Sequence, residues 1–190
     1  MKLVFATNNP NKLSELKALV PKGIEILSLK EINCNEELPE TNPTLEGNAL
    51  QKAQYVYQNY GFNCFADDTG LEIEALGGAP GVYSARYAGE DCNAEDNIKK
   101  VLTKLENKDN RNAKFRTVIA LIIKGEQNLF EGECSGKIIK TKSGQEGFGY
   151  DPIFTPKRHK VTFAEMNKDE KGKISHRGKS VEKLVDFLHR

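Results

Sequence analysis

An apolar run that ends in two adjacent carboxylates constrains the fold of this chain most strongly. Residues 62–66 are typical of a buried strand, and Asp67, Asp68, Thr69 and Gly70 follow at once. Carboxylates at the end of a strand meet a ligand at the rim of an open α/β sheet. Paired acids also suit Mg²⁺, which binds oxygen ligands and bridges to phosphates. The alternative is a solvated turn, because Asp, Thr and Gly are common turn residues.

Strand-like and helix-like patterns alternate along the rest of the chain, which favours an α/β fold. Apolar periodicity predicts strands at residues 2–6, 24–29 and 71–76, and helices over residues 13–20, 49–60, 97–105 and 181–188. Residues 115–123 and 129–134 predict an antiparallel hairpin. Gly- and Pro-containing stretches at 31–43, 77–81 and 144–150 predict loops.

Composition narrows the class of protein. The 190 residues fit one domain or a compact two-lobed one. With 28 basic and 27 acidic residues, the chain lacks the basic surplus of a dedicated nucleic-acid binder. The four cysteines lie far apart, which argues against zinc, and no apolar run reaches the roughly 20 residues of a membrane helix. We therefore expect a soluble, cytoplasmic protein without a nucleic-acid or membrane partner.

Two groups of polar residues suit a phosphorylated ligand. Residues 7–9 and Lys12 lie between a predicted strand and a predicted helix, where free N–H groups and the helix dipole attract anions. An ordinary N-cap turn is the alternative there. Glu40 follows in an acidic, irregular stretch, and Lys52 lies on the next helix. A solvated surface glutamate is the alternative for Glu40. The chain contains neither a Walker A loop nor a dinucleotide fingerprint.

Two later groups suit a nucleotide base. Phe148 lies among glycines and could stack on a ring, while Asp151 could accept a ring N–H. Lys171, His176 and Arg177 could donate hydrogen bonds to an oxo group or a phosphate. The alternatives are a tight turn with a partly buried aromatic and a capped helix start with solvated charges.

Taken together, these segments resemble the inosine triphosphate pyrophosphatase family, the Ham1-like or RdgB-like enzymes that act on non-standard purine nucleoside triphosphates. The matching blocks, in the order of the family, are residues 7–12, 48–53, 66–71, 77–86, 147–152 and 175–178. Asn8 stands where many members carry glycine, and Thr69 stands where serine is common. Gly47 stands where many members have glutamate, and Glu46 lies one position earlier.

The resemblance implies a mixed, twisted sheet with flanking helices, in two lobes around a central substrate cleft, with residues 1–190 as one Ham1-like domain. It implies Mg²⁺-dependent hydrolysis of ITP, dITP and XTP to the monophosphate and pyrophosphate, which keeps aberrant purines out of DNA and RNA. It also implies a homodimer. Catalysis is expected at Asp68, with Glu40, Asp67 and Asp68 at the metal. The implied substrate contacts are Thr7, Asn8, Asn9, Lys12, Lys52, Thr69, Phe148, Gly149, Tyr150, Asp151, Lys171, His176 and Arg177.

Two other functions remain open at this level. A nucleotide-binding regulator would need the phosphate turn and the base pocket but not the two adjacent acids. A Maf-like pyrophosphatase would act on modified pyrimidine or 7-methyl-guanine nucleotides instead. His176 and Arg177 favour a 6-oxopurine, because a donor pairs with O6 but not with the amino group of adenine. We therefore expect strong exclusion of ATP and weaker exclusion of GTP.

Overall fold

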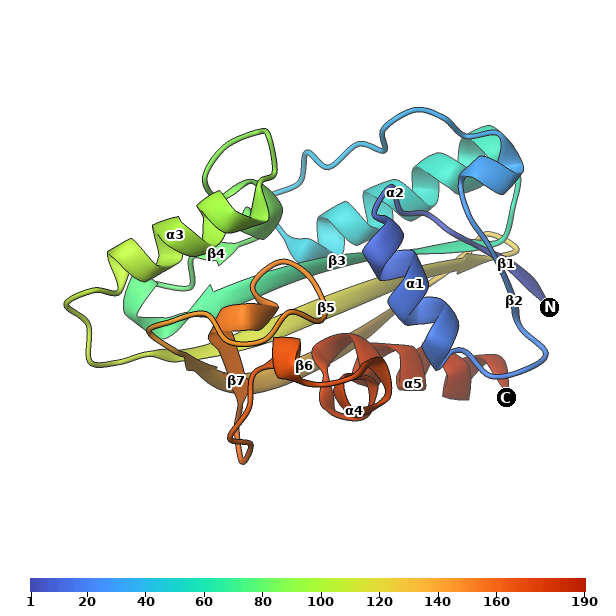
Figure 1. The fold of residues 1–190 in the computed structure, drawn as a ribbon. Helices are drawn as coiled ribbons and strands as arrows, with labels where there is room; N and C mark the ends of the chain where they lie inside the picture. The colour runs from blue at the N-terminus through green and yellow to red at the C-terminus, as the bar shows by residue number, and fades with distance from the viewer. The chain divides into compact units, whose positions relative to one another are not determined.

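The computed structural model describes all residues from 1 to 190 and contains a mixed sheet with five helices (Figure 1). The strands are β1 Lys2–Phe5, β2 Glu25–Leu27, β3 Cys64–Ile73, β4 Pro80–Gly81, β5 Asn112–Ile123, β6 Glu126–Ile138 and β7 Phe154–Pro156. The helices are α1 Pro10–Leu19, α2 Leu45–Tyr60, α3 Ala94–Lys104, α4 Lys168–Ile174 and α5 His176–Leu188. The α/β fold class is thus confirmed.

Hydrogen bonding places the strands in the order β2-β1-β3-β5-β6-β7, with β4 paired to β3. Strand β1 runs parallel to both neighbours, with Val4 beside Leu27 of β2 and Cys64 of β3. Strands β4 and β7 run antiparallel to β3 and β6. Lys124 and Gly125 join β5 to β6 with φ of 51° and 88°. Positive φ at both positions is what a two-residue hairpin turn requires, so the predicted hairpin is confirmed.

The chain divides into two compact units, and each unit is assembled from separate stretches of sequence. The first unit combines residues 1–68, 117–132 and 177–190, and the second combines residues 69–116 and 133–176. Strands β3, β5 and β6 each contribute residues to both units.

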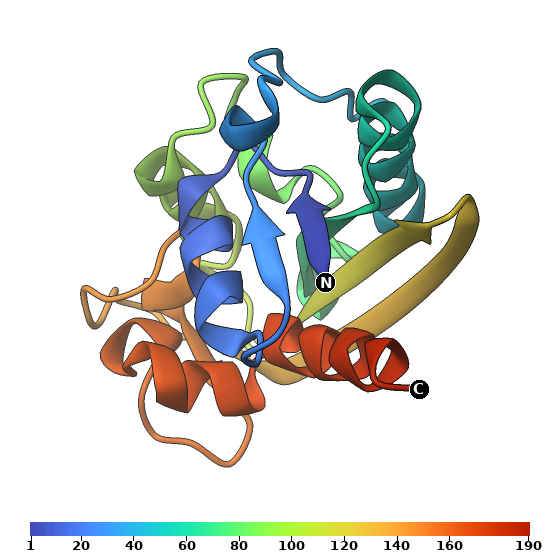
Figure 2. The ribbon, with the colours of Figure 1, turned by 90° about the vertical axis from the view of Figure 1, so that its right-hand side faces the viewer.

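The first unit buries side chains on both faces of its strands. Val4 and Ala66 join a cluster with Val56 of α2, whereas their neighbours Phe5 and Phe65 join a second cluster. The second cluster also holds the apolar side chains of α1 and α5, so these two helices cover the face opposite α2 (Figures 1 and 2). Successive strand residues point to opposite faces, which explains why consecutive residues such as Val4 and Phe5, or Phe65 and Ala66, are all apolar.

The second unit has one core, built around Phe115 of β5. The ring of Phe115 lies 4.7 Å from that of Phe154 and 5.9 Å from that of Phe163, centroid to centroid. Ile98 and Val101 of α3 belong to the same buried cluster. Aromatic pairs of this kind add stability beyond the area that they bury.

The sequence-based prediction for residues 62–76 is wrong in one important respect. Asp67, Asp68, Thr69 and Gly70 do not end a strand, because β3 runs without interruption from Cys64 to Ile73. The side chain of Asp67 is fully buried, and tertiary contacts therefore override the turn preference of these residues. The adjacent acids lie in the middle of a ten-residue strand.

Three further differences concern element boundaries. Helix α4 was not predicted, although Asn167 and Glu170 form a capping box at its start. Helix α5 begins at His176, so His176 and Arg177 form its first turn rather than precede it. Pro80 and Gly81, predicted as loop, form the short strand β4. None of the helices has the length and apolarity needed to cross a membrane.

Candidate active site

The turn between β1 and α1 is held by its own side chains. Asn9 caps α1, and its Oδ1 accepts hydrogen bonds from the backbone N–H groups of Asn11 at 2.9 Å and Lys12 at 3.2 Å. The hydroxyl of Thr7 accepts a bond from the Asn9 N–H at 3.1 Å. The N-cap alternative is therefore correct for Asn9. It is compatible with an anion at the helix end, because the dipole of the helix remains.

Asn8 uses both ends of its side chain on another segment of the first unit. Its Oδ1 accepts from the Leu38 N–H at 3.2 Å, and its Nδ2 donates to the carbonyl of Glu36 at 3.3 Å. Both polar atoms of the Asn8 side chain therefore take part in hydrogen bonds within the protein. A contact between Asn8 and the substrate stays a prediction.

Asp67 anchors two cations beneath this turn. Its Oδ1 lies 3.1 Å from Lys12 Nζ, and its Oδ2 lies 3.3 Å from a terminal nitrogen of Arg177. Burial opposes ionisation of this carboxyl, which is 0% exposed, but the nearby charges of Lys12, Arg177 and Lys52 outweigh burial and hold its pKa well below the usual range. Asp67 is therefore a buried carboxylate that fixes Lys12 beside the turn between β1 and α1.

Arg177 was predicted to read the base, and the structure shows a different partner set. Its side chain is 2% exposed and also donates to Glu15 of α1 at 2.5 Å. Its guanidinium thus joins α1, β3 and α5 within the first unit. A contact between Arg177 and the base stays a prediction. Glu15 was not identified from sequence, because a glutamate on a helix carries no signal of a buried partner.

Lys52 connects Glu40 to β3. Its ammonium group donates to the carbonyl of Asp67 at 2.7 Å and forms a short ion pair with Glu40. Burial lowers the pKa of Lys52, but Asp68 and Glu40 outweigh that effect and raise it. Lys52 is therefore a charged lysine, and it brings an acid from the irregular segment before α2 to the strand with the paired acids.

Asp68 is a nearly buried carboxyl group in the middle of β3. Its side chain is 7% exposed, and burial raises its pKa although Lys52 and Lys12 act in the opposite direction. A carboxylate with a raised pKa is a stronger base than a solvated one. Glu40 differs, because the charge of Lys52 outweighs burial and lowers the pKa of Glu40.

The residues present fit a magnesium ion that is shared with a substrate. No group of three or more His, Cys, Asp or Glu side chains is placed to hold a metal ion by protein ligands alone. Mg²⁺ commonly uses one or two carboxylates together with substrate phosphates and water, and Glu40 and Asp68 supply two. Both oxygens of Asp67 accept from cations, so a role of Asp67 at the metal stays a prediction.

The second unit holds another cluster of predicted residues. Asp151, which is buried, accepts from the Phe148 N–H at 2.9 Å and from Lys171 Nζ at 2.7 Å through the same oxygen, Oδ2. Lys171 Nζ also lies 5.1 Å from the centre of the Phe148 ring. Residues 147–151 thus form a tight turn that holds the half-buried Phe148 ring close to Lys171. Contacts of Phe148 and Asp151 with a base stay predictions.

The other predicted residues of the second unit have varied surroundings. His176 is buried and stacks on Phe115 with the ring centroids 4.5 Å apart. The hydroxyl of Tyr150 donates to the carbonyl of Ser84 at 2.6 Å. Thr69 is half-buried on β3, and Gly149 has a φ of 60°. Their contacts with a substrate stay predictions.

A cavity of about 1060 Å³ lies elsewhere in the second unit. Its lining includes Lys114, Lys137 and the loop residues 157–160. None of the residues predicted for the active site lines it. Volume alone therefore does not identify the chemistry of this protein.

Many known proteins are similar in sequence to the chain that carries these two groups of residues. Residues 3–187 match the model of the Ham1 family. The dITP/XTP pyrophosphatase of Christiangramia forsetii is 59% identical over 188 residues, which cover 99% of this chain and 99% of that protein. The dITP/XTP pyrophosphatase of Bacillus subtilis is 46% identical over 189 residues, covering 97% of this chain and 96% of that protein.

Solved structures agree with these sequence relationships. The Staphylococcus aureus Ham1 protein superposes with a TM-score of 0.89 at 39% identity, covering 100% of this chain and 98% of that one. A HAM1 protein from Coxiella burnetii gives a TM-score of 0.90 at 37% identity, with the same coverage. The predicted family is thus confirmed by sequence and by structure, and this chain belongs to the Ham1 family.

Proposed function

We propose that this protein is a pyrophosphatase that converts non-standard purine nucleoside triphosphates, such as dITP, ITP and XTP, to the monophosphate and pyrophosphate. One observation of the structure carries the proposal. Asp68, a buried carboxylate with a raised pKa, interacts electrostatically with Lys12, Lys52 and Glu40. A base beside cations and a second acid is what attack of water on a polyphosphate needs. The similar proteins named dITP/XTP pyrophosphatase support the choice of substrate.

The reaction assigns a separate task to each charged group. Asp68 accepts a proton from water as the water oxygen attacks the α-phosphorus, and the bond to the bridging oxygen of pyrophosphate breaks. Lys12 and Lys52 offset negative charge on the phosphates, as positioned cations do in phosphoryl transfer. Asp67 keeps Lys12 in place. Mg²⁺, bound through Glu40, Asp68 and the phosphates, would neutralise further charge on the leaving group.

The base is assigned to residues of the second unit. Phe148 offers a half-buried ring for stacking, and Lys171 is fixed over that ring by Asp151. Thr69, Gly149, Tyr150 and His176 complete the proposed set, and Arg177 remains proposed from the family resemblance. A 6-oxo group can accept hydrogen bonds from the proposed donors Lys171, His176 and Arg177, whereas the 6-amino group of adenine would leave these donors unpaired.

The setting of this activity is also a proposal. In the cytoplasm the enzyme would remove aberrant purines from the nucleotide pool before polymerases use them. We further propose a homodimer in which residues 1–190 act as one domain. Light scattering should then give about twice the 21.2 kDa mass of the chain.

A panel of triphosphates tests the function directly. Purified protein with Mg²⁺ should release pyrophosphate and monophosphate in equal amounts from ITP, dITP and XTP, less from GTP and least from ATP. Release of orthophosphate and diphosphate would place the attack at the γ-phosphorus and contradict the proposal. Binding without turnover would favour the regulator, and turnover confined to modified pyrimidine or 7-methyl-guanine nucleotides would favour a Maf-like enzyme.

A further inference from the structure

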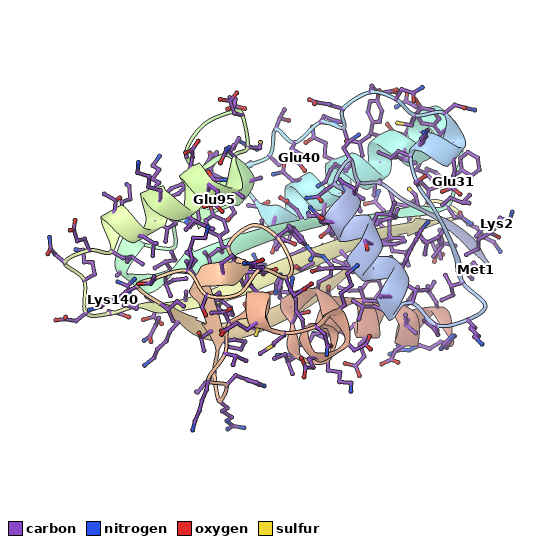
Figure 3. All side chains as sticks on the ribbon, viewed as in Figure 1. Met1, Lys2, Glu31, Glu40, Glu95 and Lys140 are labelled. Carbon is purple, nitrogen blue, oxygen red and sulfur yellow. The ribbon has the colours of Figure 1, made fainter.

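The segment that carries Glu40 has no regular secondary structure, yet side chains from other elements hold it at both ends. We define the Glu40 strap as residues 36–42, which lead into α2 of the first unit. Figure 3 shows Glu40 on this segment, beside the first turns of α2. Three backbone N–H groups of the strap, those of Leu38, Thr41 and Asn42, donate to side-chain oxygens.

The first end of the strap is attached to the phosphate turn. Asn8 accepts from the Leu38 N–H at 3.2 Å and donates to the Glu36 carbonyl at 3.3 Å. Its neighbours Thr7 and Asn9 build the turn at the start of α1. Asn8 therefore ties the strap to the turn that is proposed to bind phosphate. A glycine at this position would have no side chain to make either bond.

The second end is attached to α2 by two amides. Gln51 Oε1 accepts from the Thr41 N–H at 2.9 Å and from Asn42 Nδ2 at 3.0 Å, while Gln51 Nε2 donates to the Thr41 hydroxyl at 2.9 Å. Asn48 Oδ1 accepts from the Asn42 N–H at 2.8 Å. Glu40 directly precedes Thr41 and Asn42 and forms an ion pair with Lys52, the residue next to Gln51 on α2.

Close packing reinforces the second attachment. A Cβ atom at Gly47 would lie 2.7 Å from Cβ of Asn42, so the strap rests on the backbone of the first turn of α2. This approach leaves no room for a Cβ atom at position 47 unless Asn42 moves. Glu40 therefore lies between attached residues, with Leu38 before it and Thr41 and Asn42 after it, and its carboxylate pairs with Lys52.

We propose that Asn8 and Gln51 are positioning residues, which hold Glu40 in the orientation that the metal requires and link the phosphate turn to the metal ligand. The inference rests on the proposed function for the role of Glu40. Residues that orient metal ligands without touching the metal typically change metal affinity or activity by about 10–100-fold when mutated.

The first test removes the hydrogen bonds and keeps the size. Gln51→Met retains a long side chain but cannot form a hydrogen bond with the Thr41 N–H or with the Thr41 hydroxyl. Gln58→Met is the matched control, because Gln58 is an exposed glutamine on the same helix. Amide hydrogen exchange followed by NMR should show faster exchange at Thr41 in Gln51→Met and wild-type exchange in Gln58→Met. Asn8→Ala should speed exchange at Leu38 instead.

The second test measures the metal. We expect Gln51→Met and Asn8→Ala each to raise the Mg²⁺ concentration for half-maximal activity by about tenfold, with kcat recovering at saturating Mg²⁺. Titration with Mn²⁺ followed by electron paramagnetic resonance should show the same weakening without turnover. Gln58→Met should match the wild type in both measurements.

Two results would overturn the inference. One is that variants whose strap amides exchange faster still need the same Mg²⁺ concentration for half-maximal activity as the wild type and bind Mn²⁺ equally well. The other is a loss of kcat that Mg²⁺ does not restore, together with a lower melting temperature, which is the signature of a merely structural role. If the wild-type protein releases no pyrophosphate from any triphosphate, the proposed function fails. The exchange and Mn²⁺ measurements still decide the role of the strap in that case.

Discussion

Asp68 and Asp67 are neighbours on one strand, and their surroundings give them opposite properties. Burial raises the pKa of Asp68, whereas the cations around Asp67 outweigh burial and lower the pKa of that carboxyl. Strand neighbours point to opposite faces of the sheet, which allows adjacent acids to have different partners.

Replacing Asp68 should remove catalysis and leave the fold. Asp68→Asn keeps the size of the side chain but not its charge or basicity, and the loss of a positioned proton acceptor lowers turnover by about 10²–10⁴-fold. The measurement is kcat with ITP at saturating Mg²⁺, with circular dichroism as the check on folding. Near-normal turnover would show that another group accepts the proton.

Replacing Asp67 should instead weaken the fold. Asp67→Asn leaves the buried cations Lys12 and Arg177 without their shared counter-charge, and breaking a buried pair in this way costs about 3–5 kcal/mol. Urea unfolding should report the loss. Asp91→Asn, at an exposed position, is the control and should leave the free energy of unfolding unchanged.

The pH dependence of stability follows the same carboxylate. Because the pKa of Asp67 is lower in the folded state than in the unfolded one, its contribution is present above about pH 4, the ordinary Asp range. That contribution is lost as the pH falls through the folded value. The free energies of unfolding of the wild type and of Asp67→Asn, measured at a series of pH values, should therefore converge as the pH falls. Values that diverged as the pH fell would contradict this assignment.

Lys52 should set the acid limb of the pH–activity profile. Its charge opposes the rise in the pKa of Asp68 that burial causes, so Lys52→Met should raise this pKa further. Since Asp68 acts in its ionised form, the acid limb of kcat/KM should move to higher pH. A limb that stayed in place or moved to lower pH would assign it to another group.

At the scale of elements, the turn at residues 147–151 shows how a loop can be fixed by one contact. A Cβ atom at Gly147 would lie 2.1 Å from Oδ2 of Asp151, and the φ of Gly147 is 72°. At Gly149 φ is 60°, but no atom lies within 4 Å of a built Cβ. A side chain at position 149 would therefore introduce backbone strain alone, whereas a side chain at position 147 would also introduce a steric clash.

This difference predicts unequal stability losses. Gly149→Ala should cost about 1–2 kcal/mol, the usual penalty of a left-handed conformation for a residue with a Cβ atom. Gly147→Ala should cost more, because the added methyl group also displaces the Asp151 carboxylate from Lys171. Chemical unfolding of both variants provides the comparison, and equal losses would mean that Asp151 moves aside freely.

Local patterns predicted most elements of this fold. Leu13, Leu16 and Leu19 recur at helical spacing on α1, and Gly61 ends α2 in a left-handed conformation, as helix-ending glycines do. The failures came where local preference and tertiary context disagree. Asp67 and Asp68 prefer turns, yet buried partners hold them in β3.

At the scale of the whole molecule, three strands supply residues to both compact units. Melting the middle of β3 or β5 would remove strand residues from each unit at once. We therefore expect a single cooperative unfolding transition, as small single domains show. Circular dichroism and tyrosine fluorescence should give coincident denaturation curves. Two separated transitions would contradict the assignment of residues 1–190 to one domain.

The sequence by itself determined the fold class, the family and the segments that form the candidate site. Those features are encoded in local periodicity and in motifs of a few residues, such as residues 66–71. The partners of the functional side chains were decided only by the tertiary structure. Asp67 meets Lys12 across 55 positions and Arg177 across 110 positions, and Asn8 meets Leu38 across 30. Such pairings depend on how strands and helices pack, because burial leaves a charged or polar group only the partners that the fold brings to it.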